Sequence, residues 1–149
     1  MSITKKKKKW ARFPRSSDRL LDNNLRAISS ILKHTKVLYV VDLKDYDQLR
    51  DQHGKAVRKR IRVYGTYNFN EDAIRIKILG TSVSGVHFYN RVKLIVKIAI
   101  HESLEKMRYG KFSIHHDHVD NWENDIYERM SEKQIAYIWS LLPPLPATQ

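Results

Sequence analysis

The amino-acid sequence predicts an α+β fold: an N-terminal helix, a small antiparallel sheet with a β-hairpin, a central core helix and a long C-terminal helix. Three observations support this class. Apolar residues recur every three or four positions in segment 17–34, which is typical of a helix with one buried face. They alternate with basic residues in segment 57–79, which predicts two strands. They fill most sides of segment 89–109, which predicts a buried helix.

The composition sets the outer limits of this domain. With 149 residues, of which 42% are hydrophobic, the chain suits one globular domain. We expect a basic arm over residues 1–16, the α+β domain over 17–142 and a proline-rich tail over 143–149. The absence of cysteine excludes disulfides, thiolate metal ligands and a cysteine nucleophile. Because no secretory signal or membrane-spanning run is present, we expect an intracellular, cytoplasmic protein without membrane contact, or a nuclear one in a eukaryotic host.

The first predicted helix runs from Ser17 to about His34, with Ser16 or Ser17 as its N-cap. Its buried face should be formed by Leu21, Leu25, Ile28 and Leu32. The next segment, residues 36–42, is rich in β-branched and aromatic residues with little polar alternation. This pattern predicts a strand that is buried on both faces.

The hairpin is predicted by a strict alternation of apolar and basic residues. Its strands, 57–67 and 73–79, are joined by the turn sequence NFNED. The core-facing residues of the second strand should be Ile74, Ile76 and Ile78. The exposed face of the hairpin should then carry Arg58, Arg60, Arg62, Arg75 and Lys77.

The second half of the domain is predicted to be helical on both sides of a polar loop. The core helix covers residues 89–109, with Gly110 as its C-cap. Residues 111–118 are predicted to form the loop. The last helix follows over 119–142, with a break near Ser131.

Positive charge is concentrated in the first 100 residues. They hold 23 Lys and Arg against 8 Asp and Glu, whereas residues 101–149 hold 5 against 8, for a net charge of +12. Such a basic surface favours a polyanionic partner. Our first hypothesis is therefore a non-enzymatic viral or phage accessory protein that binds nucleic acid, or a complex acting on nucleic acid, and needs no cofactor. Docking on an acidic host protein is an alternative use of the same charge.

The predicted nucleic-acid contacts lie in the arm and on the hairpin. Basic residues of the arm would meet phosphates, while Trp10 would stack on bases. These basic residues are Lys5, Lys6, Lys7, Lys8, Lys9, Arg12 and Arg15. The surface would be extended by Arg58, Arg60, Arg62, Arg75 and Lys77. A solubilising tail or a nuclear-localisation patch is the alternative interpretation of the arm.

The sequence HESLE, residues 101–105, suggests a metal site on the core helix. His101 and Glu105 lie one helical turn apart, so both can reach one ion, and Glu102 stands beside the first ligand. A further ligand would come from Glu123 or from the histidine cluster that begins at His115 and includes His116 and His118.

A simpler explanation of the same residues is a polar surface. Lys93, Lys97, His101 and Glu105 follow one another at intervals of four, which predicts a solvated stripe along an otherwise apolar helix. In this interpretation the sequence HHDH is a polar loop before the last helix, with Asp117 or Asp120 as the N-cap.

The hairpin VYGTYNFNEDAIRIKIL and the helix LIVKIAIHESLEKM together resemble small zincin-like phage proteins and, more distantly, SprT-like metallopeptidases, over about residues 36–140. In that family a Gly-x-Tyr strand, a turn and an Ile-x-Ile strand lead into a helix with the motif His-Glu-x-x-His. His101 and Glu102 match its first two positions, whereas Glu105 replaces the second histidine. The resemblance implies a zinc-dependent peptidase with His101 and Glu105 as ligands, Glu102 as general base, and a further ligand from His115 or Glu123.

Overall fold

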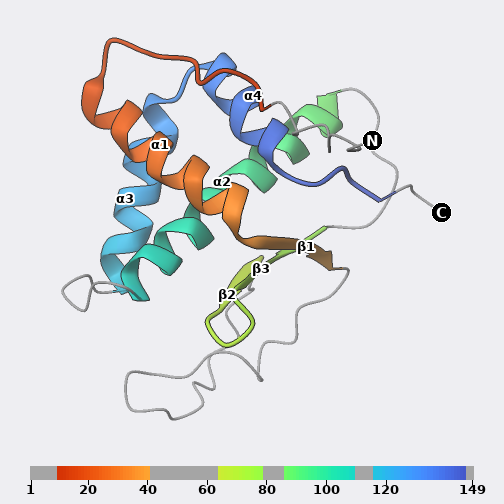
Figure 1. Cartoon of the computed structure of the whole chain (residues 1–149). Coiled ribbons are helices and arrows are strands. Elements are labelled where there is room, and N and C mark those ends of the chain that lie inside the picture. Colours follow the sequence, from red (N-terminus) through yellow and green to blue (C-terminus); the bar gives the residue numbers. More distant parts are fainter. Residues whose placement is uncertain (1–9, 41–63, 79–85, 110–115, 147–149) are drawn as a thin grey trace, which may run out of the picture.

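The computed structural model describes residues 10–40, 64–78, 86–109 and 116–146, and it confirms the α+β class (Figure 1). Four helices and three strands follow one another in these parts of the chain. They are α1 (Arg19–His34), β1 (Lys36–Val40), β2 (Gly65–Asn68), β3 (Ala73–Lys77), α2 (Val86–Tyr109), α3 (His116–Arg129) and α4 (Glu132–Leu141). None of these helices combines the length and the apolar character needed to cross a bilayer.

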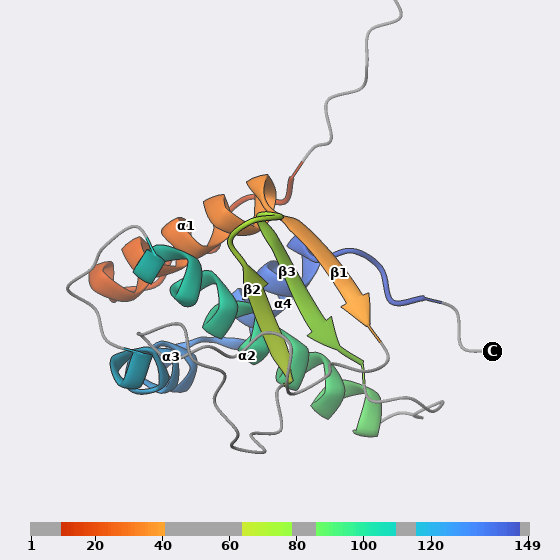
Figure 2. The same ribbon diagram turned by 90° about the horizontal axis from the view of Figure 1, so that it is seen from below.

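The sheet is mixed rather than purely antiparallel. Its strand order is β1-β3-β2, so β3 lies in the centre (Figure 2). β3 pairs antiparallel with β2 across the predicted hairpin, with Gly65 opposite Ile76. It pairs parallel with β1, where Lys36 lies opposite Ala73 and Val40 opposite Lys77. The parallel pair was not predicted, because its partners are separated by 37 positions and no local pattern reports their pairing.

β1 is an edge strand of this sheet, and the prediction that it is buried on both faces is wrong. Lys36 is exposed and the other four residues are only half-buried. In the described sheet β1 pairs with β3 alone, and the core helix α2 packs on β2 and β3 instead. Tyr39 donates a hydrogen bond from its hydroxyl to the carbonyl oxygen of Pro143 at 2.7 Å. Burial raises the pKa of this tyrosine to about 12.

The hairpin confirms the predicted turn and the predicted inner face of β3. Ile74 and Ile76 are fully buried, whereas Ile78, which follows the end of β3, is only partly buried. In the turn, Asp72 adopts a positive φ of 48°, which a short polar side chain tolerates better than a bulky one. Its carboxylate accepts hydrogen bonds from the Tyr67 hydroxyl and from the Lys106 ammonium, both at 2.7 Å. The predicted strand residues 57–63, including Arg58, Arg60 and Arg62, lie outside the described residues.

Helix α1 has the predicted buried face and the predicted end, but a different N-cap. Leu21, Leu25, Ile28 and Leu32 are all buried. The N-cap is Asp18, which accepts a hydrogen bond from the backbone N–H of Leu21 at 3.0 Å. Neither Ser16 nor Ser17 takes this position. The hydroxyl and the backbone N–H of Ser16 both donate to the Asp22 carboxylate instead, at 2.7 and 2.9 Å.

Helix α2 is the central element of the core, as predicted. It packs against β2 and β3 on one side and against the other three helices (Figures 1 and 2). Its fully buried residues include Val96, Ala99, Ile100 and Leu104. This central place explains why segment 89–109 is apolar on most of its sides.

The long C-terminal helix is broken at the predicted point, between α3 and α4. Ser131 caps α4 in a capping box with Gln134, whose side chain accepts from the Ser131 backbone N–H while the Ser131 hydroxyl accepts from the Gln134 backbone N–H. Helix α3 already begins at His116, so the loop prediction is wrong for residues 116–118. For the same reason neither Asp117 nor Asp120 is an N-cap.

Candidate metal centre

One histidine in the C-terminal half of α2 lies against two acidic residues of α3. His101 Nδ1 is 2.8 Å from Glu123 Oε1 and 3.3 Å from Asp120 Oδ1. Asp120 and Glu123 are three residues apart on α3, so they project from the same side of that helix. Helix α3 packs along α2 (Figure 1). The two short distances show that this side of α3 faces His101.

The other ring nitrogen of His101 faces two acidic residues of its own helix. Nε2 lies 3.6 Å from Glu105 Oε1 and 3.9 Å from Glu102 Oε1. Both ring nitrogens therefore have two carboxylates within 4.0 Å. We call these five residues, His101, Glu102, Glu105, Asp120 and Glu123, the His101 cluster.

Most of the His101 cluster is shielded from solvent. The side chain of His101 is 19% exposed and that of Glu105 is 9% exposed, so the predicted solvated stripe is wrong at this end of α2. Lys93 and Lys97, further towards the start of the helix, are 32% and 38% exposed. Asp120 is the open side of the cluster, with 64% of its side chain exposed.

The acidic surroundings govern the protonation of His101. Burial alone lowers the pKa of the imidazole, because a charged ring loses hydration. The hydrogen bond to Glu123 and the negative charges of Glu102, Glu123 and Glu105 act in the opposite direction and raise the pKa to about 9. At neutral pH the ring is therefore a cation, and its Nδ1–H donates a hydrogen bond to Glu123 Oε1.

Two basic side chains compensate part of the acidic charge. Lys97 Nζ lies 3.7 Å from Glu123 Oε2, and Arg108 Nε donates to Glu105 Oε2 at 2.9 Å. The cluster has four carboxylates, so Lys97 and Arg108 leave two negative charges among the named groups. The protonated imidazole balances one of them, and both remain when a metal ion displaces the ring proton. A divalent cation would balance these two charges.

Glu102 is fixed by the close approach of α2 to β2. Gly65 in β2 allows this approach, because a Cβ atom at that position would lie 2.5 Å from Ile98 Cγ2 and 3.1 Å from Glu102 Cγ. Glu102 is only 5% exposed, between the strand and the imidazole. The glycine of the sequence GTY thus determines how near the strand comes to the cluster.

The structure brings together four of the predicted metal-site residues: His101, Glu102, Glu105 and Glu123. The fifth, His115, lies outside the described residues. Sequence reasoning missed Asp120 as a member of the cluster and considered it only as a helix cap. Its spacing of three residues from Glu123 was the available signal, but that signal depends on knowing that α3 begins before Asp120.

The predicted nucleic-acid residues are placed less uniformly. Lys5 to Lys9 precede the described part of the chain. Arg12 and Arg15 are exposed, whereas Trp10 is half-buried against the core, with Lys33 Nζ 5.5 Å from its ring centre. On β3 the basic residues are less open than predicted: Lys77 is half-buried, and Arg75, 21% exposed, pairs with Glu71.

Comparisons with protein-family models, with curated proteins and with solved structures find no match for this chain. The resemblance to zincin-like proteins therefore stays a prediction. The His101 cluster and the surface of the described residues are the structural features that bear on function.

Proposed function

We propose that this protein binds one divalent transition-metal ion, with zinc as the first candidate, through His101 Nδ1, Asp120 and Glu123. The observation that carries the proposal is a single imidazole held between carboxylates of two helices. The candidate ligand atoms of these three residues all lie within 4.8 Å of one another. One imidazole nitrogen and two carboxylate oxygens form a donor set that suits zinc and similar ions.

The remaining residues of the His101 cluster suit a supporting role. A histidine that binds a metal commonly donates its second ring N–H to a carboxylate, which fixes the ring and raises its basicity. Glu105 and Glu102 lie on the Nε2 side, and Arg108 holds Glu105 in place. We therefore assign Glu105 to orienting the imidazole, rather than to binding the ion as the resemblance implies.

The chemistry open to such a centre follows from the number of its ligands. Three protein ligands leave a coordination position for a water or substrate oxygen, where a divalent ion acts as a Lewis acid. Asp120 supplies the solvent-exposed side through which a ligand would enter. Glu102 is buried on the opposite ring nitrogen, which favours a positioning role for it over that of a general base.

Metal content tests this proposal directly. The untagged protein, purified without chelator and analysed by inductively coupled plasma mass spectrometry, should contain about one metal ion per chain. Adding zinc to chelator-treated protein should raise its melting temperature. The variants Asp120→Asn and Glu123→Gln should lose both effects, whereas Asp125→Asn, an exposed acid on the same helix, should keep them.

A negative result in these measurements would contradict the metal proposal. If the protein carries no metal and zinc does not change its melting temperature, the His101 cluster is a structural ion-pair network around a protonated imidazole. Metal binding that survives in Glu123→Gln and in Asp120→Asn would likewise contradict the assigned ligands.

A further inference from the structure

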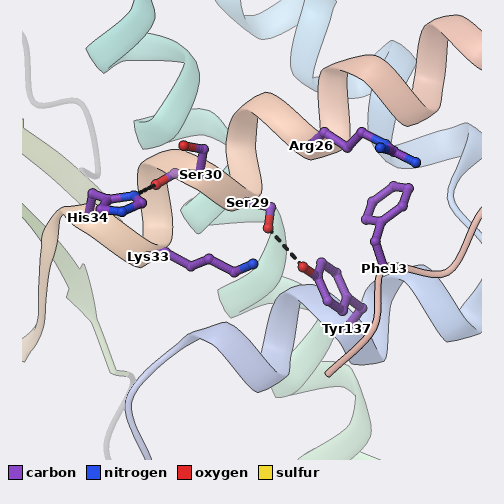
Figure 3. Close-up of a pocket in the computed structure, with 7 residues that line it drawn as sticks. All are labelled: Phe13, Arg26, Ser29, Ser30, Lys33, His34 and Tyr137. Carbon is purple, nitrogen blue, oxygen red and sulfur yellow. Dashed lines mark hydrogen bonds between the residues drawn. The ribbon is translucent and has the colours of Figure 1, made fainter. Parts of the chain in front are cut away.

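A shallow groove lies along helix α1, next to its core face, and the buried residues Ser29 and Tyr137 form part of its lining. It shares no residue with the His101 cluster. Its volume is about 360 Å³. Figure 3 shows that five of its seven lining residues come from α1, while Phe13 comes from the segment before α1 and Tyr137 from α4. We call this site the α1 groove.

The α1 groove combines positive charge with aromatic rings. Arg26 and Lys33 project into it from α1, and none of its seven lining residues is acidic. Because they are seven residues apart, their positions on the helix are separated by two turns, or about 10 Å along the axis. His34 lies beside Lys33 at the end of the helix, where its Nδ1 donates to the carbonyl oxygen of Ser30 at 2.8 Å.

The rings of Phe13 and Tyr137 contact each other and the two cations. Phe13 and Tyr137 meet edge to face, with their ring centres 5.4 Å apart. Tyr137 is held in turn by a hydrogen bond of 2.9 Å between its hydroxyl and that of the buried Ser29 (Figure 3). The Arg26 guanidinium lies 4.9 Å from the centre of the Phe13 ring, and Lys33 Nζ lies 6.0 Å from that of Tyr137.

The segment that carries Phe13 is held against the domain by a hydrogen bond from α4. The side-chain amide of Gln134, which is 1% exposed, donates to the carbonyl oxygen of Pro14 at 3.3 Å and to Asp22 Oδ1 at 3.2 Å. Phe13 is thus held over α1 by a buried polar contact one residue away. The groove is therefore a preformed feature of the domain surface.

A run of basic residues directly precedes the described part of the chain. Lys33 lies over the ring of Trp10 as well, so the described chain begins at one end of the groove. The five lysines Lys5 to Lys9 directly precede Trp10 in the sequence.

We propose that the α1 groove binds single-stranded nucleic acid. Arg26 and Lys33 would contact successive parts of the phosphate backbone, and a base would stack on the layer formed by the Arg26 guanidinium and the Phe13 ring. Base stacking on arginine planes and aromatic rings, combined with a basic path for the backbone, is the general mode by which proteins bind unpaired strands. This mode needs no sequence-specific hydrogen bonds.

Fluorescence anisotropy with a labelled oligothymidylate, over a series of salt concentrations, tests the proposal. The double variant Arg26→Gln/Lys33→Gln should bind more weakly, and the slope of log K against log salt should become shallower by about 1.4, because two single-strand phosphate contacts are lost. Lys93→Gln/Arg129→Gln removes the same charge at ion pairs outside the groove and should retain the wild-type slope. Circular dichroism checks that both variants are folded.

A second substitution separates stacking from charge. Arg26→Lys keeps the positive charge but loses the planar group, so it should preserve the salt slope and lower the affinity. Equal losses in the groove variant and the charge-matched control would overturn the proposal, because binding would then follow net charge alone. Absence of binding to the oligonucleotide would overturn it as well. Chelator-treated protein should bind as the untreated protein does, so this result is independent of the metal proposal.

Discussion

Some polar side chains of this protein connect several segments at once, because one side chain can make more than one hydrogen bond. Asp22 is the clearest example outside the His101 cluster. Its carboxylate accepts hydrogen bonds from the hydroxyl and backbone of Ser16 and from the amide of Gln134. It therefore joins the segment before α1, α1 itself and α4. A buried carboxylate with three donors should contribute to stability in a way that depends on pH.

Asp22→Asn should lower the melting temperature at neutral pH, since Asn offers one acceptor oxygen where the carboxylate offers two. The hydrogen bond from the Ser16 hydroxyl is the largest cause that holds the pKa of Asp22 below 3.8 in the folded state. A lowered folded-state pKa gives stability that is present above pH 3.8 and is lost as the pH falls through the folded value. The stability difference between wild type and variant should therefore shrink below pH 3.8.

Urea unfolding at several pH values measures this difference. Asp125→Asn, an exposed acid on α3, serves as the control and should show little change at any of these pH values. A difference for Asp22→Asn that stays constant from neutral to acidic pH would show that the carboxylate charge does not contribute.

At the scale of elements, the contact between β2 and α2 fixes the position of Glu102 within the His101 cluster. A strand can approach a helix this closely only where its residue lacks a side chain. Gly65 meets that requirement, because a Cβ there would lie 2.5 Å from Ile98 Cγ2. The same Cβ would lie 3.1 Å from Glu102 Cγ. A shift of β2 would therefore also displace Glu102, the residue next to His101.

Gly65→Ala should destabilise the protein by about 1–3 kcal/mol, the usual cost of overpacking a tight contact. The cost should be smaller when Ile98 is also replaced by Ala, because the obstructing methyl group is then absent. A double-mutant cycle by urea unfolding measures this coupling. Equal costs in both backgrounds would show that the strand moves freely away from the helix.

The break between α3 and α4 is the second structural feature at the scale of elements. Ser131 begins α4 with a capping box, and Gln134 of the same box reaches the Pro14 carbonyl and Asp22. The break thus orients α4 so that one polar side chain holds the segment beside the α1 groove. A continuous helix would place Gln134 elsewhere.

Ser131→Ala should cost about 1 kcal/mol of unfolding free energy, since the first turn of α4 loses an acceptor for its backbone N–H groups. Ser131→Asp should restore most of that loss, because Asp is an equally good cap. Thermal or urea unfolding measures both variants. If the aspartate variant were as unstable as the alanine variant, the hydroxyl would have a role other than capping.

At the scale of the whole molecule, local patterns predicted local structure well. The apolar faces of α1 and β3, the end of α2 at Tyr109 and the break at Ser131 all follow from residue spacing, which records which side of an element is buried. The start of α2 was predicted three residues too late, since the helix begins at Val86. The parallel pairing of β1 with β3 did not follow, because it depends on how distant segments meet.

The same distinction between local and long-range contacts applies to the candidate sites. HESLE predicted three members of the His101 cluster because they lie on neighbouring turns of one helix. Asp120 required the position of α3, which the polar sequence HHDH concealed. The α1 groove was invisible in the sequence, since Phe13, Lys33 and Tyr137 come from three separate segments.

The contact between Tyr39 and Pro143 has a consequence for solubility. An outer strand offers unpaired backbone groups on which another copy of the chain can build a continuous sheet, and such pairing leads to aggregation. The residues PPLP at 143–146 pass near β1, held by the Tyr39 hydroxyl and by the packing of Leu145. Since proline has no N–H to donate, a segment with three prolines beside Tyr39 offers few groups on which a further strand could pair.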